Sequence, residues 1–271
     1  MADRRPIGVF DSGVGGLTVL AALLARLPDE CFVYLGDTAR LPYGAKTPAT
    51  VERYSLQCAA LLRRYDVKAI AIACNTAASV AVPAVTQAHA PLPVLGVLEP
   101  GAAAAVAASA SGRIAVLATE ATIAGGAYER AIRALDPRAT VTGLACPLFV
   151  ALAEEGLTSG PIVDAVVRHY LEGLDPLIDT VVLGCTHFPV LAPALRAALG
   201  RRAIVDSAAT TAAALAGLLS RHGALAEGGE PPAPRVRFLA TDGVARFARV
   251  GRAFFGDALT DDRVELVDFA G

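Results

Sequence analysis

Short apolar runs rich in β-branched residues alternate along the chain with longer segments rich in alanine and leucine. This alternation is typical of β-α units built around a largely parallel sheet, and it predicts an α/β fold. Near the C-terminus the pattern predicts an amphipathic helix over Val244–Phe255 and a strand-like segment, VELVDF, which we assign to the same unit as the N-terminal strands. The other predicted strands cover residues 7–10, 31–36, 69–73, 94–97, 113–118, 140–144, 180–184, 203–206 and 235–240.

A weak internal repeat links the two halves of the chain. Ile7–Phe10 resembles Ile114–Leu117, and Ile70–Cys74 resembles Val181–Cys185, so that the two pairs have similar offsets. A repeat of this kind indicates two pseudo-symmetric α/β domains with largely parallel sheets. We expect residues 1–98 plus 208–271 to form the first domain and residues 99–207 the second. If the halves pack about a pseudo-twofold axis, the two strand-end cysteines Cys74 and Cys185 meet at the domain interface, and the active site lies there.

Composition narrows the possible partners. The chain is 54% hydrophobic and 18% charged with a net charge of -2, which favours a globular protein and argues against a nucleic-acid or membrane partner. No apolar run approaches the roughly 18 residues of a membrane span, and the N-terminal segment has no signal-peptide core. We therefore expect a cytoplasmic protein.

Five cysteines are scattered along the chain without a C-x-x-C pair, and only 4 histidines accompany them. This spacing argues against a disulfide framework or a zinc site, so reduced thiols are expected. Cys31, Cys58 and Cys146 are interpreted as small core residues.

Cys74 and Cys185 differ from the other cysteines in their position. Each follows a predicted buried strand, at a point where a helix is expected to begin, and each is the counterpart of the other in the repeat. Ligands gather beyond the carboxyl ends of parallel strands, and a helix N-terminus favours a thiolate over a thiol. Both cysteines are therefore candidate reactive groups with low thiol pKa values.

Polar residues follow both cysteines. Asn75-Thr76 and Thr186-His187 could bind a carboxylate at a helix N-terminus, although the same residue types also serve as helix caps. His187 could also exchange a hydrogen bond with the Cys185 thiol or with a substrate.

Two further segments carry carboxylates. Asp11 and Ser12 follow the first strand and precede Gly13, Gly15 and Gly16, which are expected to let the backbone turn tightly. The segment lacks the lysine of a phosphate loop, so a nucleotide site is not favoured. Asp11 could equally be a turn residue, and Glu154 and Glu155, which we place in the first turn of a helix, could simply be solvated.

Six motifs, DSGVGG, LPYG, ACNTA, GVLEPGA, CPLFVALAEEG and LGCTHFP, occur in the order and spacing of the glutamate racemases of the aspartate/glutamate racemase family. The resemblance covers nearly the whole chain. It implies two pseudo-symmetric α/β domains, no cofactor or metal, and a homodimer that interconverts L- and D-glutamate and supplies D-glutamate for peptidoglycan. The chain departs from the family at Gly125-Gly126, where a serine often follows the preceding T-x-x-T element.

The resemblance also assigns residue roles. Cys74 and Cys185 become the two catalytic acid/bases, assisted by Asp11, Glu154 and His187. The implied substrate-binding residues are Asp11, Ser12, Pro42, Tyr43, Gly44, Asn75, Thr76, Thr119, Thr122, Thr186 and His187.

Related activities remain as alternatives. Aspartate racemases typically carry glutamate where this chain has His187, and arylmalonate-type decarboxylases keep only the second cysteine, whereas both are present here. A non-catalytic amino-acid binding module is the third alternative.

Overall fold

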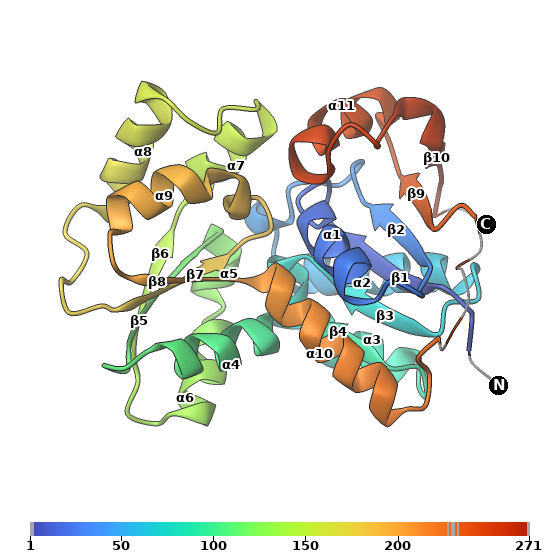
Figure 1. Cartoon of the computed structure of the whole chain (residues 1–271), viewed down its shortest axis with the longest axis horizontal. Coiled ribbons are helices and arrows are strands. Elements are labelled where there is room, and N and C mark those ends of the chain that lie inside the picture. The colour runs from blue at the N-terminus through green and yellow to red at the C-terminus, as the bar shows by residue number, and fades with distance from the viewer. Residues whose placement is uncertain (1–2, 227, 229–230, 232, 270–271) are drawn as a thin grey trace.

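The computed structural model describes residues 3–226, 228, 231 and 233–269 and contains two parallel sheets, one in each half of the molecule (Figure 1). The α/β class with two largely parallel sheets is confirmed. The first sheet has the order β10-β9-β2-β1-β3-β4 and the second the order β6-β5-β7-β8. The first sheet contains β1 (Ile7–Asp11), β2 (Phe32–Gly36), β3 (Ala69–Ile72), β4 (Val94–Gly96), β9 (Val236–Ala240) and β10 (Val264–Leu266). The second contains β5 (Arg113–Ala118), β6 (Thr140–Ala145), β7 (Thr180–Gly184) and β8 (Ala203–Asp206).

The internal repeat is visible in the strand order. The first sheet contains the order 2-1-3-4 and the second the order 6-5-7-8, so that β1 corresponds to β5 and β3 to β7. All pairings are parallel, with Phe10 beside Ile72 in one sheet and Leu117 beside Leu183 in the other. The C-terminal strands β9 and β10 extend the first sheet beyond β2, as predicted. The division of the chain after residue 98 and again after residue 207 stays a prediction.

Helices connect successive strands and begin where the sequence provides caps. Thr47 caps the helix that starts at Pro48, and Asp206 Oδ1 accepts the amide of Ala208 at 2.8 Å. The α-helices are α1 (Leu17–Arg26), α2 (Pro48–Arg63), α3 (Asn75–Ala88), α4 (Leu98–Ala108), α5 (Glu120–Ala124), α6 (Ala127–Leu135), α7 (Pro147–Glu154), α8 (Pro161–Leu171), α9 (Ala192–Leu199), α10 (Ser207–Arg221) and α11 (Val244–Phe255). The 3₁₀ turns of the described residues are η1 (Tyr43–Ala45), η2 (Phe188–Leu191) and η3 (Asp261–Arg263).

The two halves share a hydrophobic core. Ile114 and Val116 of β5 belong to the core that also fills the first half, whereas Ala115 and Leu117 belong to a second core. This alternation reflects the two faces of a strand. The α10 helix packs on α1 of the first half and on α4 of the second. In Figure 1 it begins where the two halves meet. The relative placement of the sheets, and hence of the site between them, is fixed by apolar packing.

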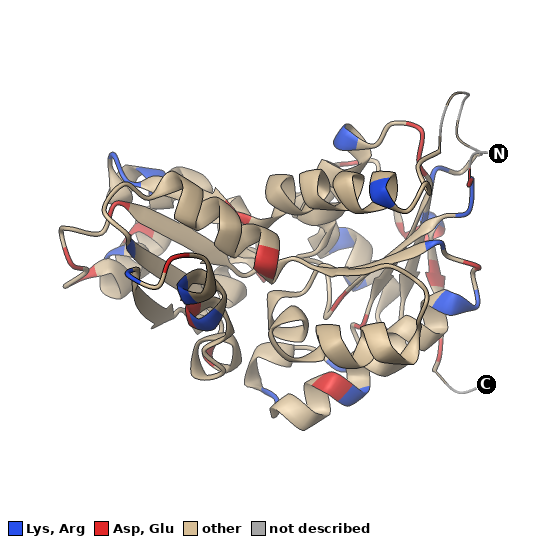
Figure 2. Cartoon of the chain, turned by 90° about the horizontal axis from the view of Figure 1, so that it is seen from below, with Lys and Arg blue, Asp and Glu red and all other residues tan. Residues whose placement is uncertain are grey.

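The remaining sequence predictions concern thiols, charge and membranes. All five cysteines are buried and none of them forms a disulfide, and Cys58 lies fully buried on α2, as expected for a core residue. Figure 2 shows Lys and Arg interspersed with Asp and Glu on both halves. Within the described residues, no helix has the length and apolar character needed to cross a bilayer.

Candidate active site

Cys74 and Cys185 line one small cavity between the two sheets. Cys74 follows β3 of the first sheet and Cys185 follows β7 of the second, so the carboxyl ends of equivalent strands meet here. The cavity has a free volume of about 30 Å³. The predicted meeting of the two strand-end cysteines at the interface is confirmed.

Most of the predicted site residues share this cavity. Its wall contains Ser12, Pro42, Tyr43, Gly44, Cys74, Asn75, Thr76, Thr119, Glu154, Cys185, Thr186 and His187, together with Gly13, Leu41 and Val150. Asp11 and Thr122 lie behind the wall and are almost completely buried. Asp11 accepts the Gly13 amide at 2.9 Å and the Thr186 hydroxyl at 3.3 Å, and Thr122 lies 3.0 Å from the Thr119 hydroxyl. These two residues therefore support neighbours that line the cavity.

Cys74 caps the N-terminus of α3, as the sequence predicted. Its sulfur accepts the Ala77 amide at 3.5 Å and lies 3.7 Å from the Ser12 hydroxyl oxygen. The expected low pKa is nevertheless wrong for this thiol in the structure. Burial and the negative charge of Asp11 raise the pKa of Cys74 to about 12, outweighing the helix N-terminus. The resting form of Cys74 is therefore the neutral thiol.

Cys185 has different surroundings. The expected α-helix does not start directly after it, because a turn and the 3₁₀ turn η2 come before α9. Its sulfur lies 3.9 Å from Nδ1 of His187. Burial alone would lower the pKa of His187, but its contacts with Cys185 and Glu154 raise that pKa to about 10. The imidazole is therefore cationic where it lies beside the Cys185 sulfur.

Glu154 approaches His187 from the other side. The prediction that Glu154 lies in a first helical turn was wrong, since it is the last residue of α7, and Glu155 beside it is exposed. Glu154 Oε1 lies 3.4 Å from His187 Nε2, an ion-pair distance at which that nitrogen still has no well-aligned hydrogen bond. His187, followed by Arg246, lowers the pKa of Glu154 against the opposing effect of burial. An ionised carboxylate therefore faces a cationic imidazole.

The glycine loop after β1 serves close packing. The backbone bends and turns over residues 12–16 as expected, and it does so without a positive φ angle at Gly13, Gly15 or Gly16. A Cβ atom at Gly15 would lie 2.5 Å from both the His187 ring and the Thr186 hydroxyl, and one at Gly44 would lie 2.6 Å from Thr119. Glycine at these two positions lets loops of the first half touch the second half beside the cavity.

The oxygen and the nitrogen of the Asn75 side-chain amide differ in their hydrogen bonding. Its Oδ1 accepts hydrogen bonds from Tyr128 at 2.7 Å and from Ser207 at 3.3 Å, while its buried Nδ2 has no partner among the described residues. Buried amide groups are normally paired. Because Asn75 lines the cavity, its free N–H group is suited to bind an oxygen of a ligand.

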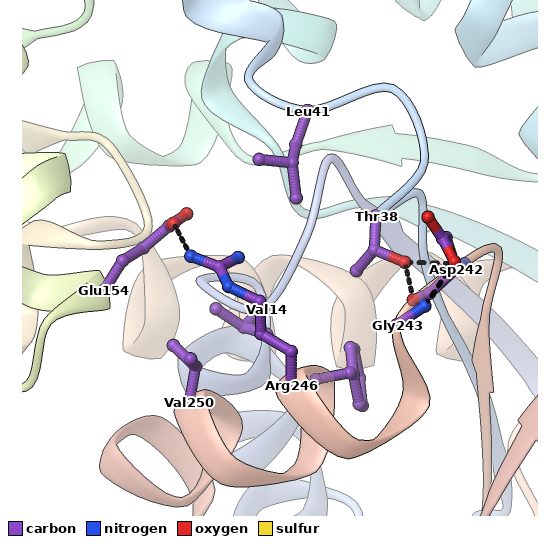
Figure 3. Close-up of a pocket in the computed structure, with 9 residues that line it drawn as sticks. Val14, Thr38, Leu41, Glu154, Asp242, Gly243, Arg246 and Val250 are labelled. Carbon is purple, nitrogen blue, oxygen red and sulfur yellow. Dashed lines mark hydrogen bonds and ion pairs between the residues drawn. The ribbon is translucent and has the colours of Figure 1, made fainter.

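Residues that the sequence did not single out hold several of these groups in place. Tyr128 and Ser207 orient Asn75, and buried Asp37 accepts the hydroxyl of Tyr43. Arg246 of α11 lies 3.1 Å from Glu154 Oε2, and Figure 3 shows the two side chains meeting from opposite sides of a neighbouring cavity. No local sequence signal marks Tyr128, Ser207 or Arg246, since each acts on a partner at least 53 residues away. Asp37 is the exception, because it is close to Tyr43 in the sequence. In the described part of the chain, no cluster of three or more His, Cys, Asp or Glu side chains is arranged to hold a metal ion.

The chain is similar to known proteins over nearly its whole length. Residues 12–215 match the family model of Asp/Glu/Hydantoin racemases. The chain is 45% identical to the glutamate racemase of Geobacter metallireducens, over 95% of each chain, and 44% identical to that of Neisseria meningitidis serogroup A, over 97% of each.

Solved structures give the same result. The glutamate racemase of Francisella tularensis in complex with D-glutamate superimposes with a TM-score of 0.91 at 36% identity, over 99% of each chain. That of Thermus thermophilus, in complex with β-chloro-D-alanine, has a TM-score of 0.88 at 41% identity, over 98% of each chain. The match in sequence, fold and extent confirms the resemblance noted in the sequence: the chain belongs to the Asp/Glu/Hydantoin racemase family.

Proposed function

We propose that this chain is a cofactor-independent glutamate racemase that uses Cys74 and Cys185 as its two acid/bases. The observation that carries the proposal is that the two cysteines come from equivalent strand ends of the two sheets and line the same cavity. Relatives named glutamate racemase, among them one bound to D-glutamate, support glutamate as the substrate.

The reaction requires removal of the Cα proton from one face and delivery of a proton to the other. One cysteine thiolate takes the Cα proton and becomes a thiol, and the opposite thiol gives its proton to the carbanion and becomes a thiolate. The pair thus holds one exchangeable proton in every resting form, and the two thiols titrate as a coupled unit. The reverse reaction uses the same groups in exchanged roles.

The other site residues assist in two ways. His187, held by Glu154, stabilises negative charge on Cys185, and Ser12 is within reach of the Cys74 sulfur. The free amide of Asn75 and the hydroxyl groups of Thr76, Thr119 and Thr186 bind the carboxylates of glutamate, with Pro42, Tyr43 and Gly44 closing the cavity. Asp11 and Thr122 act from behind the cavity wall through Thr186 and Thr119. Hydrogen-bond donors arranged in a dry site stabilise the charge that develops at Cα and its carboxylate.

The same proposal includes the cellular setting. D-glutamate made in the cytoplasm supplies peptidoglycan synthesis, and the enzyme acts as a homodimer.

A cofactor-free assay tests the activity. Purified protein incubated with L-glutamate or with D-glutamate should bring the circular dichroism of the amino acid to zero from either side. L-aspartate should not be racemised at a comparable rate, and release of carbon dioxide would indicate a decarboxylase. An inert protein would point to a binding module.

Deuterated water tests the two-base step. Product should carry deuterium at Cα from the first turnover, while recovered substrate remains protonated, because each thiol serves one face. Proton NMR should show this pattern from both enantiomers. Equal labelling of substrate and product at early times would rule out two opposed thiols.

A further inference from the structure

We propose that Arg246 is a positioning residue of the site: by binding Glu154 across the interface it holds the carboxylate against His187, and through His187 it sustains the reactive form of Cys185. The inference deepens the proposed racemase function and rests on it for its effect on turnover.

The contacts form a chain of four side chains that leads from the surface to the thiol. Arg246 Nη2 lies 3.1 Å from Glu154 Oε2, and Glu154 Oε1 lies 3.4 Å from His187 Nε2. His187 Nδ1 lies 3.9 Å from the Cys185 sulfur. The two carboxylate oxygens thus have different partners, so the bond to Arg246 fixes the rotation that turns the other oxygen toward His187.

The four residues do not come from the same half of the molecule. Arg246 belongs to α11, which packs on α1 and β10 of the first half, whereas Glu154, His187 and Cys185 lie on α7 and after β7 of the second half. Figure 3 shows Glu154 and Arg246 approaching from opposite sides of a cavity of about 100 Å³ that Leu41 and Val250 also line. The first half therefore contributes to the surroundings of the second half's cysteine through a contact that crosses the interface.

Charge and exposure indicate how Arg246 acts. The Glu154 side chain is 16% exposed and that of Arg246 is 50% exposed, so solvent weakens the direct effect of the guanidinium on the buried groups. The Glu154 carboxylate faces His187 and Arg246, and Asp242 lies across the cavity. His187 in turn faces Cys185 and Asp11. Orientation of Glu154 should thus outweigh the long-range charge of Arg246. Loss of Arg246 should release Glu154 and deprive the imidazolium of its counterion, so that the positive charge beside the Cys185 sulfur is less well held.

The test measures the two cysteines separately. Alkylation by iodoacetamide, followed by mass spectrometry between pH 6 and 10, reports the thiolate fraction at Cys74 and at Cys185. In Arg246→Ala and Arg246→Met the Cys185 profile should move to higher pH, with labelling at neutral pH slowed about three- to tenfold, while the Cys74 profile stays unchanged. Arg246→Met keeps the side-chain stem and so controls for lost packing.

Kinetics and a double-mutant cycle complete the test. Racemisation by Arg246→Ala should fall about tenfold in kcat/KM, and Arg246→Lys should recover part of it, because lysine keeps the charge without the planar fork. In a Glu154→Gln background the Arg246→Ala change should have almost no further effect. Arg249→Ala, an exposed arginine on the same helix, should behave as wild type.

Several results would overturn the proposal. They are a wild-type Cys185 profile in Arg246→Met, an equal shift at Cys74, faster labelling of Cys185, or full additivity with Glu154→Gln. Because alkylation needs no turnover, a protein that shows the Cys185 shift but does not racemise glutamate would contradict the proposed function and leave the role of Arg246 standing.

Discussion

Replacing Gly15 by alanine should separate the two halves of the site. The new Cβ would lie 2.5 Å from His187 Nδ1 and from Thr186 Oγ1, whereas ordinary contacts begin at 3.4 Å, so the Thr186-His187 segment must move by about 1 Å. A misplacement of that size costs about 10²-fold in rate, or about 2.7 kcal/mol of transition-state stabilisation. We therefore expect kcat/KM to fall about a hundredfold.

The same variant should remain folded. Overpacking costs about 1–3 kcal/mol, which a chain of this size should survive with a lower Tm. Gly217→Ala on α10 is the control, because its Cβ would meet only the flexible end of Arg221, at 3.3 Å, and Gly217 does not line the cavity. Rates come from circular dichroism of both glutamate enantiomers, and folding is followed by far-UV melting. Activity of Gly15→Ala within about threefold of wild type, or an equal loss in Gly217→Ala, would refute the close-contact argument.

Three further predictions follow from the charges and hydrogen bonds of the site. Tyr128→Phe should raise KM several-fold with little change in kcat, because it removes the hydroxyl that orients the Asn75 amide; an unchanged KM in steady-state kinetics would argue against that role. Asp11→Asn should speed alkylation of Cys74 at pH 8, because loss of the neighbouring negative charge lowers the thiol pKa. Slower labelling of Cys74 by mass spectrometry would contradict the role of Asp11 in raising that pKa. The pKa of His187 is raised from 6.5 to about 10, so its contribution to stability is complete below pH 6.5 and is lost as pH rises through about 10. The free energy of unfolding in urea should therefore decline less steeply over this pH range in His187→Asn than in the wild type. Parallel curves for the two proteins would contradict the shifted pKa.

The strands and the two special cysteines could be predicted because both depend on local pattern. Buried parallel strands are short apolar runs, and the residue after such a run lies at the edge where ligands bind, whatever the rest of the chain does. Cys74 and Cys185 were therefore identified before their partners were known.

The electrostatics of the site could not be predicted in the same way. The local rule that a helix N-terminus favours a thiolate fails at Cys74, because burial, followed by the carboxylate of Asp11 from a different strand, raises the pKa of the thiol. The position of Glu154 at the end of α7 depended on where that helix begins, and helix boundaries are poorly marked in sequence. Arg246 could not be recognised because its partner lies 92 residues away and contact depends on how the halves pack.

The repeat of strand order in the two sheets is not matched by the groups around the two thiols. Cys74 has Ser12 and Asp11 nearby, whereas Cys185 has His187 backed by Glu154. Enantiomers have equal free energies in water, so no protein can make kcat/KM differ between the two directions of a racemisation. If the two cysteines share one proton, as proposed, unlike surroundings influence which of them holds it in the free enzyme. An enzyme whose proton rests mainly on Cys74 can bind and convert one enantiomer directly, but it must first move that proton to convert the other. As a result, kcat and KM are both larger in one direction. The different surroundings of the two cysteines, in a fold that is otherwise duplicated, thus influence which enantiomer of glutamate has the lower KM.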